Sequence, residues 1–173
     1  MNVLLHSCCG PCASACVPRL KEEGHAVTMF YSNSNIDTRA EFEKRLEAAR
    51  TLAAAEGVTL VADDYDHAAW LRAVADGYEN EPEKGRRCER CYRYNLARTA
   101  AYAAANGFTA FTTSLTVSPH KVSEMVFAAS DDPHFLKENF KKHEGFKRSL
   151  ARSAELGLYR QSYCGCEFSK RMV

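Results

Sequence analysis

The sequence predicts an α/β fold in which a mainly parallel sheet is flanked by helices. Two observations support this prediction: short apolar runs alternate with helical patterns along the chain, and glycines or turn-prone polar segments separate them. Strands that alternate with helices are typical of parallel sheets. The chain has 173 residues, which is enough for one domain and short for two. We therefore expect residues 1–173 to form a single Rossmann-like, nucleotide-hydrolase-like domain.

Four apolar runs are the predicted strands. They are residues 3–6, 26–32, 58–62 and 108–113. In parallel α/β sheets, ligands bind beyond the carboxyl ends of the strands. A site is therefore expected from the segments that follow three of these strands, which are residues 7–12, 33–35 and 114–121.

Helical patterns occupy the rest of the chain up to residue 156. Residues 38–56 give the clearest pattern, because apolar side chains recur at helical spacing with charges between them and Gly57 follows as a stop. Pro18 interrupts the pattern of residues 13–23, which predicts a helix that is short, kinked or late in starting. The other predicted helices are residues 68–75, 91–105, 119–129, 133–141 and 145–156.

The composition excludes several classes of protein. Hydrophobic residues make up 46% of the chain and charged residues 26%, as in an average soluble protein, which argues against a disordered chain. No apolar run approaches the length of about 20 residues that spans a bilayer. The short apolar run at the N-terminus has no basic region before it, so no signal peptide is expected. We expect a cytoplasmic protein without membrane association.

The net charge of +1 conceals two unequal halves. Residues 1–83 carry 7 basic and 14 acidic residues, a net of −7, whereas residues 84–173 carry 16 and 8, a net of +8. Basic residues alternate with tyrosines over residues 84–98, and a second basic cluster covers residues 137–152. Such segments suit contacts with phosphates and stacking on bases, although a solvated basic face has the same composition. This asymmetry favours an anionic partner such as RNA.

Eight cysteines are the exception in this composition. Clustered thiols in a reducing compartment are more often metal ligands or redox groups than cross-links. Seven of them fall into three groups, Cys8, Cys9 and Cys12, then Cys88 and Cys91, then Cys164 and Cys166. Four thiolates are enough for a [4Fe-4S] cluster or a structural zinc, so about three would remain for a second metal, for a redox pair or for burial. The eighth, Cys16, is expected in the core.

Five segments resemble the cobalamin-independent epoxyqueuosine reductase family, QueH. They read LLHSCCGPC (4–12), FYSNSNI (30–36), RCERCYR (87–93), FTTSLTVSPHK (111–121) and GLYRQSYCGC (157–166), and they extend over nearly the whole chain. The resemblance implies the last step of queuosine synthesis. In that step the epoxide of epoxyqueuosine, at the wobble position of tRNA, is reduced by two electrons to an alkene.

The resemblance also implies a cofactor and partners. The family is expected to hold a [4Fe-4S] cluster beside a second metal site, for which a mononuclear iron is the candidate. Residues 8–12, 88–91 and 164–166 would build this iron–sulfur site. Some members have Asp where this chain has Cys12, which leaves the fourth cluster ligand open. The expected partners are the anticodon loop of tRNA and an electron donor such as a ferredoxin or flavodoxin.

Removal of an epoxide oxygen as water needs two electrons and two protons, so the site needs proton donors besides its redox cofactor. His120 ranks first as a donor, followed by Tyr163 and His6, although capping, packing beside the cluster and burial in the core are their respective alternatives. Strand ends and basic positions give the candidates for substrate binding. These are Asn33, Asn35, Arg87, Thr113, Ser114, Lys121 and Arg160.

Two other functions fit the same residues. The first is a zinc-stabilised RNA-binding module without catalysis. The second is a thiol oxidoreductase or sulfur-transfer enzyme that uses Cys88 and Cys91 as a redox pair. The turn after the first strand lacks the glycine- and serine-rich phosphate loop of the sulfur-transfer enzymes, and no dinucleotide-binding fingerprint or P-loop is present.

Overall fold

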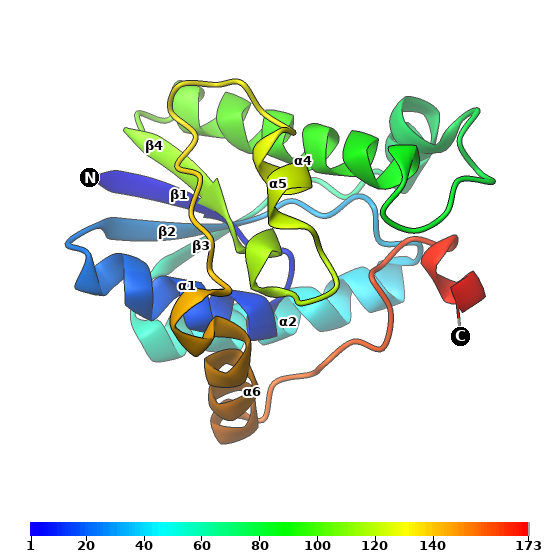
Figure 1. Ribbon diagram of the computed structural model, residues 1–173. Helices are drawn as coiled ribbons and strands as arrows, with labels where there is room; N and C mark the ends of the chain where they lie inside the picture. Colours follow the sequence, from blue (N-terminus) through cyan, green and yellow to red (C-terminus); the bar gives the residue numbers. More distant parts are fainter. Residues whose placement is uncertain (173) are drawn as a thin grey trace.

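A four-stranded sheet forms the centre of the structure (Figure 1). The computed structural model describes residues 1–172. In the order β3-β2-β1-β4 every neighbouring pair is parallel, so the carboxyl ends of all four strands lie at one edge. The strands are β1 (Asn2–His6), β2 (Ala26–Tyr31), β3 (Thr59–Ala62) and β4 (Ala110–Thr113). The prediction of a parallel, Rossmann-like α/β fold is confirmed.

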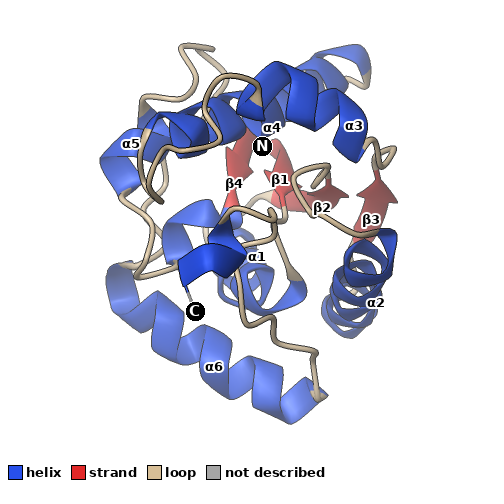
Figure 2. Cartoon of the chain, turned by 90° about the vertical axis from the view of Figure 1, so that its right-hand side faces the viewer, coloured by secondary structure: helices blue, strands red, loops and turns tan. Residues whose placement is uncertain are grey.

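Helices cover both faces of this sheet (Figure 2). Helices α1 and α2 lie on one face, with α6 packed against α1, and α4 lies on the other face over β1 and β4. The bounds are α1 (Gly10–Glu22), α2 (Arg39–Glu56), α3 (His67–Trp70), α4 (Arg86–Ala105), α5 (Ser123–Phe127) and α6 (Gly145–Leu156). The α/β body therefore leaves the carboxyl edge of the sheet open to receive the loops.

The strands divide the core into two layers because successive side chains point to opposite faces. Leu5 and Met29 pack with the helices α1 and α2, whereas Leu4 and Phe30 pack on the opposite side with residues of α4. A third, smaller cluster contains Trp70, Cys166 and Phe168, with Cys91 packed against it. This third cluster joins the C-terminal segment to the region around α3 and α4.

Helix α2 illustrates how local sequence fixes an element. Thr38 caps its N-terminus, since the side-chain oxygen accepts the N–H of Glu41 at 3.2 Å. Gly57 ends it with φ of +67°, a left-handed conformation that glycine adopts without steric cost. The predicted helix over residues 38–56 is confirmed.

Helix α1 differs from the prediction. It begins at Gly10, earlier than expected, with Cys9 as its N-cap and Pro11 in its first turn, where a missing N–H costs nothing. It also continues through Pro18, which removes one backbone hydrogen bond. The packing of α1 against both α2 and α6 keeps the helix intact there.

The predicted helix over residues 133–141 is wrong. Residues 134–136 instead run along β4: Phe111 N–H donates to the carbonyl of His134 at 3.0 Å, and Leu136 N–H donates to the carbonyl of Phe111 at 2.8 Å. β4 is an edge strand whose backbone groups need partners, and this pairing satisfies them better than a local helix would. The helical pattern there reflected local propensity alone.

Three more helices have different bounds from those predicted. The helix expected over residues 91–105 begins at Arg86, which places Cys88 as well as Cys91 on α4. The helix expected over residues 68–75 is α3 followed by a wider helical turn, Leu71–Ala75. The one expected over residues 119–129 shrinks to the short α5. Across the residues that the structure describes, no helix is long and apolar enough to cross a membrane.

The close approach of α1 to α2 generates a prediction. A Cβ on Gly10 would lie 2.9 Å from the carbonyl carbon and oxygen of Ala48 on α2, and backbone atoms cannot give way. We expect Gly10→Ala to lower the free energy of unfolding by roughly 1–3 kcal/mol, measured by urea denaturation. Glu22→Ala, at an exposed position of the same helix, is the control and should change it little. Equal stability of the two variants would show that the contact is not limiting.

Candidate active site

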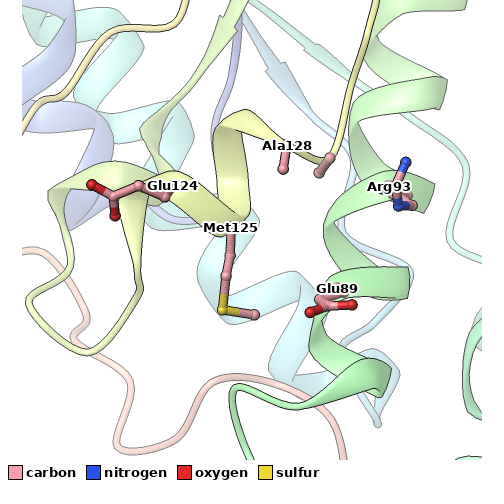
Figure 3. A pocket seen from close by; sticks show the side chains of 6 residues that line it. Glu89, Arg93, Glu124, Met125 and Ala128 are labelled. Atoms are coloured by element: carbon pink, nitrogen blue, oxygen red, sulfur yellow. The ribbon is translucent and has the colours of Figure 1, made fainter.

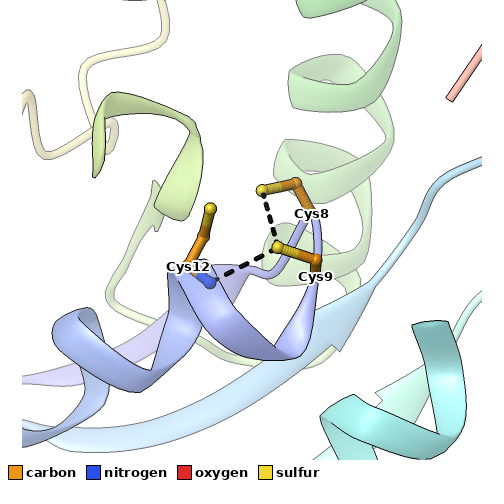
Figure 4. Close-up of side chains that lie close together, drawn as sticks. All are labelled: Cys8, Cys9 and Cys12. Atoms are coloured by element: carbon orange, nitrogen blue, oxygen red, sulfur yellow. Dashed lines mark hydrogen bonds between the residues drawn. The ribbon is translucent and has the colours of Figure 1, made fainter. Parts of the chain in front are cut away.

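The first thiol group lies where β1 leads into α1 (Figure 4). The sulfur atoms of Cys8, Cys9 and Cys12 all lie within 4.8 Å of one another. The Cys9 sulfur is also the N-cap of α1, because it accepts the N–H of Cys12 at 3.3 Å. Three sulfurs that converge in this way can hold a metal ion.

Shared protons make these three thiols unequal. Hydrogen bonds from Cys12 and Cys8 hold the pKa of the Cys9 thiol well below its usual value. The same contacts, with burial, raise the pKa of Cys12 well above its usual value. These hydrogen bonds favour negative charge on Cys9 over its two neighbours, and its place at the N-terminus of α1 acts in the same direction.

The other two thiol groups of the sequence come from distant segments, and in the structure they form a single second group. Cys88 and Cys91 lie in the first turns of α4, and Cys164 and Cys166 lie in the C-terminal segment, which returns close to this end of α4 (Figure 1). Burial raises the pKa of Cys91 well above its usual value, and negative charge on Cys164, Cys166 and Cys88 raises it further. Cys91 packs against the hydrophobic cluster that contains Cys166, whereas among the described residues only Cys8, Cys9 and Cys12 have sulfur atoms that all lie within 4.8 Å of one another.

Lys121 connects the two groups. Its Nζ donates to the sulfur of Cys164 at 3.4 Å. Negative charge at Cys164, and more weakly at Cys8 and Cys12, raises the pKa of Lys121 well above its usual value. Lys121 thus contacts Cys164 directly and lies within electrostatic range of the first thiol group, at the carboxyl edge of the sheet.

Arg45 of α2 holds the segment that carries the last two thiols. Its side chain is 2% exposed, and its guanidinium donates to the carbonyls of Cys164 at 2.7 Å and Tyr163 at 3.0 Å. Its Nε donates to Glu41 at 2.9 Å. Gly165 has φ of +148°, and a Cβ there would lie 2.9 Å from the amide nitrogen of Asn35. Only glycine therefore fits between Cys164 and Cys166.

Further contacts fasten the same segment from both sides. The N–H of Asp37 donates to the carbonyl of Gly165 at 2.9 Å, and the Asp37 carboxylate accepts from the Tyr163 hydroxyl and from Lys170, each at 2.7 Å. On the other side, His67 contacts the Glu167 carboxylate at 3.0 Å. Contacts with the α/β body therefore fix the position of the segment that carries Cys164 and Cys166.

Several residues predicted to bind substrate organise the loops at this edge. Asn33 donates to the carbonyl of Ser7 at 2.9 Å, and the side-chain oxygen of Asn35 accepts from Asn95 at 3.2 Å. Thr113 contacts a ring nitrogen of His6 at 2.9 Å. The Ser114 hydroxyl donates to the sulfur of Cys8 at 3.2 Å, so this residue, like Lys121, contacts a thiol directly.

The proton-donor candidates occupy different environments. His6 is fully buried, and burial lowers its pKa, so it is a neutral core residue. The Tyr163 hydroxyl proton is engaged by Asp37. His120 is exposed beside Lys121, and within residues 1–172 its imidazole makes no hydrogen bond. Of the three, His120 is the group free to reach a substrate.

The basic residues also separate by role. Arg87 is 2% exposed, and its Nη1 donates to the carbonyls of Tyr78 and Glu81, so it shapes the loop before α4. Arg90 likewise donates to backbone carbonyls, and Arg98 pairs with Asp63. Other cations are exposed and make no ion pair within the described part of the chain. In the C-terminal half they include Arg93, Lys137, Lys142, Lys147, Arg148 and Arg160.

A hollow of about 280 Å³ lies between α4 and α5, away from this centre (Figure 3). Glu89, Arg93 and Met125 are among the residues that line it. None of the grouped cysteines lines it, although Arg93 belongs to the basic segment predicted to contact phosphates. The thiol centre is therefore separate from this hollow.

Orphaned polar atoms surround the thiols. Among the described residues, four buried side-chain atoms lack a hydrogen-bond partner: Trp70 Nε1, Arg87 Nε, Asn95 Oδ1 and Gln161 Oε1. Arg87 and Asn95 lie on α4 with Cys88 and Cys91, Trp70 packs in the cluster that contains Cys166, and the Gln161 side chain hydrogen-bonds Cys9. Unsatisfied polar atoms gathered at one place indicate that a bound group completes the site.

Sequence reasoning missed Arg45, Trp70, Asn95 and Gln161 as site residues. Arg45 lies on the apolar face of α2, between Phe42 and Ala49, and a charge on an apolar stripe was the available signal. Trp70 is the only tryptophan in the chain, and Gln161 lies within a segment that carried the family resemblance. Nothing local distinguishes Trp70 or Gln161 as site residues, because their relevance depends on distant neighbours.

A parallel α/β sheet with three converging thiols at its carboxyl edge defines an α/β protein whose cysteines can hold a metal ion. Residues 3–172 match the family described as epoxyqueuosine reductase QueH. The chain belongs to this family of oxidoreductases, as its sequence segments predicted.

Curated relatives of that name are similar over almost the entire chain. The protein of Acinetobacter baylyi is 38% identical, with 98% of this chain and 81% of the relative covered. The protein of Thermotoga maritima is 34% identical, with 97% and 90% covered, and that of Streptococcus pyogenes serotype M1 is 33% identical, with 99% and 71% covered.

The role of Arg45 can be tested by Arg45→Lys. The variant keeps the charge, but one ammonium cannot reach Glu41 and both carbonyls at once. We expect faster amide hydrogen exchange over residues 163–166 and a free energy of unfolding lower by roughly 1–3 kcal/mol. Arg39→Lys, at an exposed position of α2, is the control. Unchanged exchange in Arg45→Lys would remove Arg45 from this role.

Proposed function

We propose that this protein is an epoxyqueuosine reductase that converts epoxyqueuosine at the wobble position of tRNA to queuosine. The reaction removes the epoxide oxygen as water, with two electrons and two protons, and leaves an alkene. The convergence of Cys8, Cys9 and Cys12 at the carboxyl edge of the sheet, in a chain that belongs to the QueH family, is the observation that carries the proposal.

The donor set fits a [4Fe-4S] cluster with an adjacent mononuclear iron. Four thiolates hold such a cluster, and seven thiols are present in groups of three and four. The orphaned N–H groups of Trp70 and Arg87 supply donors beside the sulfurs, as sites of this kind use. When bound, the cluster would supply electrons and the adjacent iron would polarise the epoxide C–O bond. We propose all seven as ligands, namely Cys8, Cys9, Cys12, Cys88, Cys91, Cys164 and Cys166.

The chain's own side chains handle protons and charge. His120 is the proposed proton donor, because its imidazole is exposed and free beside the thiol centre. Lys121, already in contact with Cys164 and within electrostatic range of the first thiol group, is placed to stabilise negative charge on the departing oxygen. Tyr163 remains a candidate for the second proton, although its hydroxyl is engaged with Asp37.

Substrate recognition combines polar atoms at the site with cations outside it. The unpartnered carbonyl oxygen of Gln161 is available to accept a hydrogen bond from the modified base or its ring hydroxyls. Ser114, Asn33, Asn35 and Thr113 shape the surrounding loops. The exposed cations without ion pairs, Arg160 among them, are the proposed contacts for anticodon-loop phosphates. A protein such as a ferredoxin or flavodoxin is the proposed electron donor.

Metal content distinguishes this proposal from its competitors. For protein purified without oxygen, we expect about four irons per chain, or slightly more, with matching acid-labile sulfide. Cys8→Ala and Cys91→Ala should lower the iron content, because each removes a ligand. Cys16→Ala is the matched control, since Cys16 lies in the hydrophobic core and should not affect iron. One zinc without sulfide would favour the RNA-binding module instead, and a metal-free, active protein would favour the thiol oxidoreductase.

Conversion of epoxyqueuosine-tRNA to queuosine-tRNA tests the reaction itself. We expect wild-type holoenzyme with a reductant to form queuosine, His120→Gln to lower kcat by about 10²–10⁴-fold, and Lys121→Met by about 10²–10³-fold. Iron content and tRNA affinity of His120→Gln should stay near wild type. Lys21→Met, at an exposed position in the last turn of α1, is the control. Full activity in His120→Gln would transfer the proton-donor role to another group.

A further inference from the structure

Trp70 is held rigidly beside the second thiol group with its polar atom unused. The side chain is 1% exposed, and the indole Nε1 has no hydrogen-bond partner within the described chain. His67 stacks on the indole at a centroid distance of 5.3 Å. His67 is fixed in turn by the Ser34 carbonyl at 2.8 Å and by Glu167 at 3.0 Å. The indole therefore cannot turn its N–H toward another acceptor.

Thiols are the acceptors available to this N–H. Trp70 packs in one cluster with Cys166 and Phe168, and Cys91 packs against the same cluster. Burial raises the pKa of the Cys91 thiol, and the nearby indole N–H of Trp70 partly offsets this rise, although the two groups form no hydrogen bond in this structure. A neutral thiol is a weak acceptor, whereas a thiolate that ligates a metal is a stronger one. The metal-bound form of Cys91 would therefore be the better acceptor for this N–H.

We propose that the indole N–H of Trp70 donates a hydrogen bond to the Cys91 thiolate in the metal-loaded protein, and that this bond raises the reduction potential of the bound cluster. The second clause rests on the proposed function. Reduction adds negative charge to the cluster and its thiolates, and an N–H donor stabilises that charge. Trp70 is thereby a positioning and tuning residue, which acts on the electron carrier rather than on the substrate.

The reduction potential of holoenzyme is the first test. Trp70→Phe keeps an aromatic ring and removes only the N–H donor and part of the ring volume. At a fixed applied potential, we expect the ratio of reduced to oxidised cluster to fall about tenfold, which corresponds to the loss of one hydrogen bond to a charged group. Tyr94→Phe is the matched control, because Tyr94 packs against the same cluster and its ring has no N–H. An unchanged potential in Trp70→Phe would overturn the tuning role.

A second measurement needs no variant. Trp70 is the only tryptophan, so its indole N–H gives a single side-chain resonance of that type. We expect its hydrogen exchange with solvent to slow when the metal site is loaded. Loading with zinc alone tests the hydrogen bond even if no cluster forms, and so separates this inference from the proposed function. Unchanged exchange in zinc-loaded and iron–sulfur-loaded protein would overturn it.

Discussion

The hydrogen bonds from the Arg45 guanidinium to the carbonyls of Tyr163 and Cys164 are the contact on which the site depends most. It links α2, a helix of the α/β body, to a segment about 120 residues later in the chain. Together with the contacts of Asp37 and His67, it holds the last two thiols, which lie on a C-terminal segment with little regular structure. A guanidinium suits this task because its fork of N–H groups can serve two carbonyls and the Glu41 carboxylate together.

Charge is the second constraint on the site. Thiols that lie close together cannot all ionise, since each thiolate disfavours the next. The structure answers with a helix N-terminus at Cys9 and an ammonium, Lys121, in contact with Cys164. The same arrangement keeps positive charge where oxygen departs in the proposed reaction. Site assembly and catalysis therefore depend on one electrostatic balance.

The parallel sheet explains why such a site can exist in a small protein. All four strands end at one edge, so loops from residues 7–12, 33–35 and 114–121 meet there without long connections. The helices on both faces leave this edge open (Figure 2). The C-terminal segment then packs beside this edge, where its Cys166 and Phe168 form a hydrophobic cluster with Trp70 of α3.

The sequence by itself determined the elements with strong local signals and the family to which the chain belongs. The parallel α/β fold, the helix from Thr38 to Gly57 and the family were all readable, because periodicity, caps and thiol spacing are local properties. Only the tertiary structure decided the extended path of residues 134–136, the contact of Lys121 with Cys164 and the roles of Arg45 and Trp70. Each of these depends on partners far away in the chain, which no local pattern encodes.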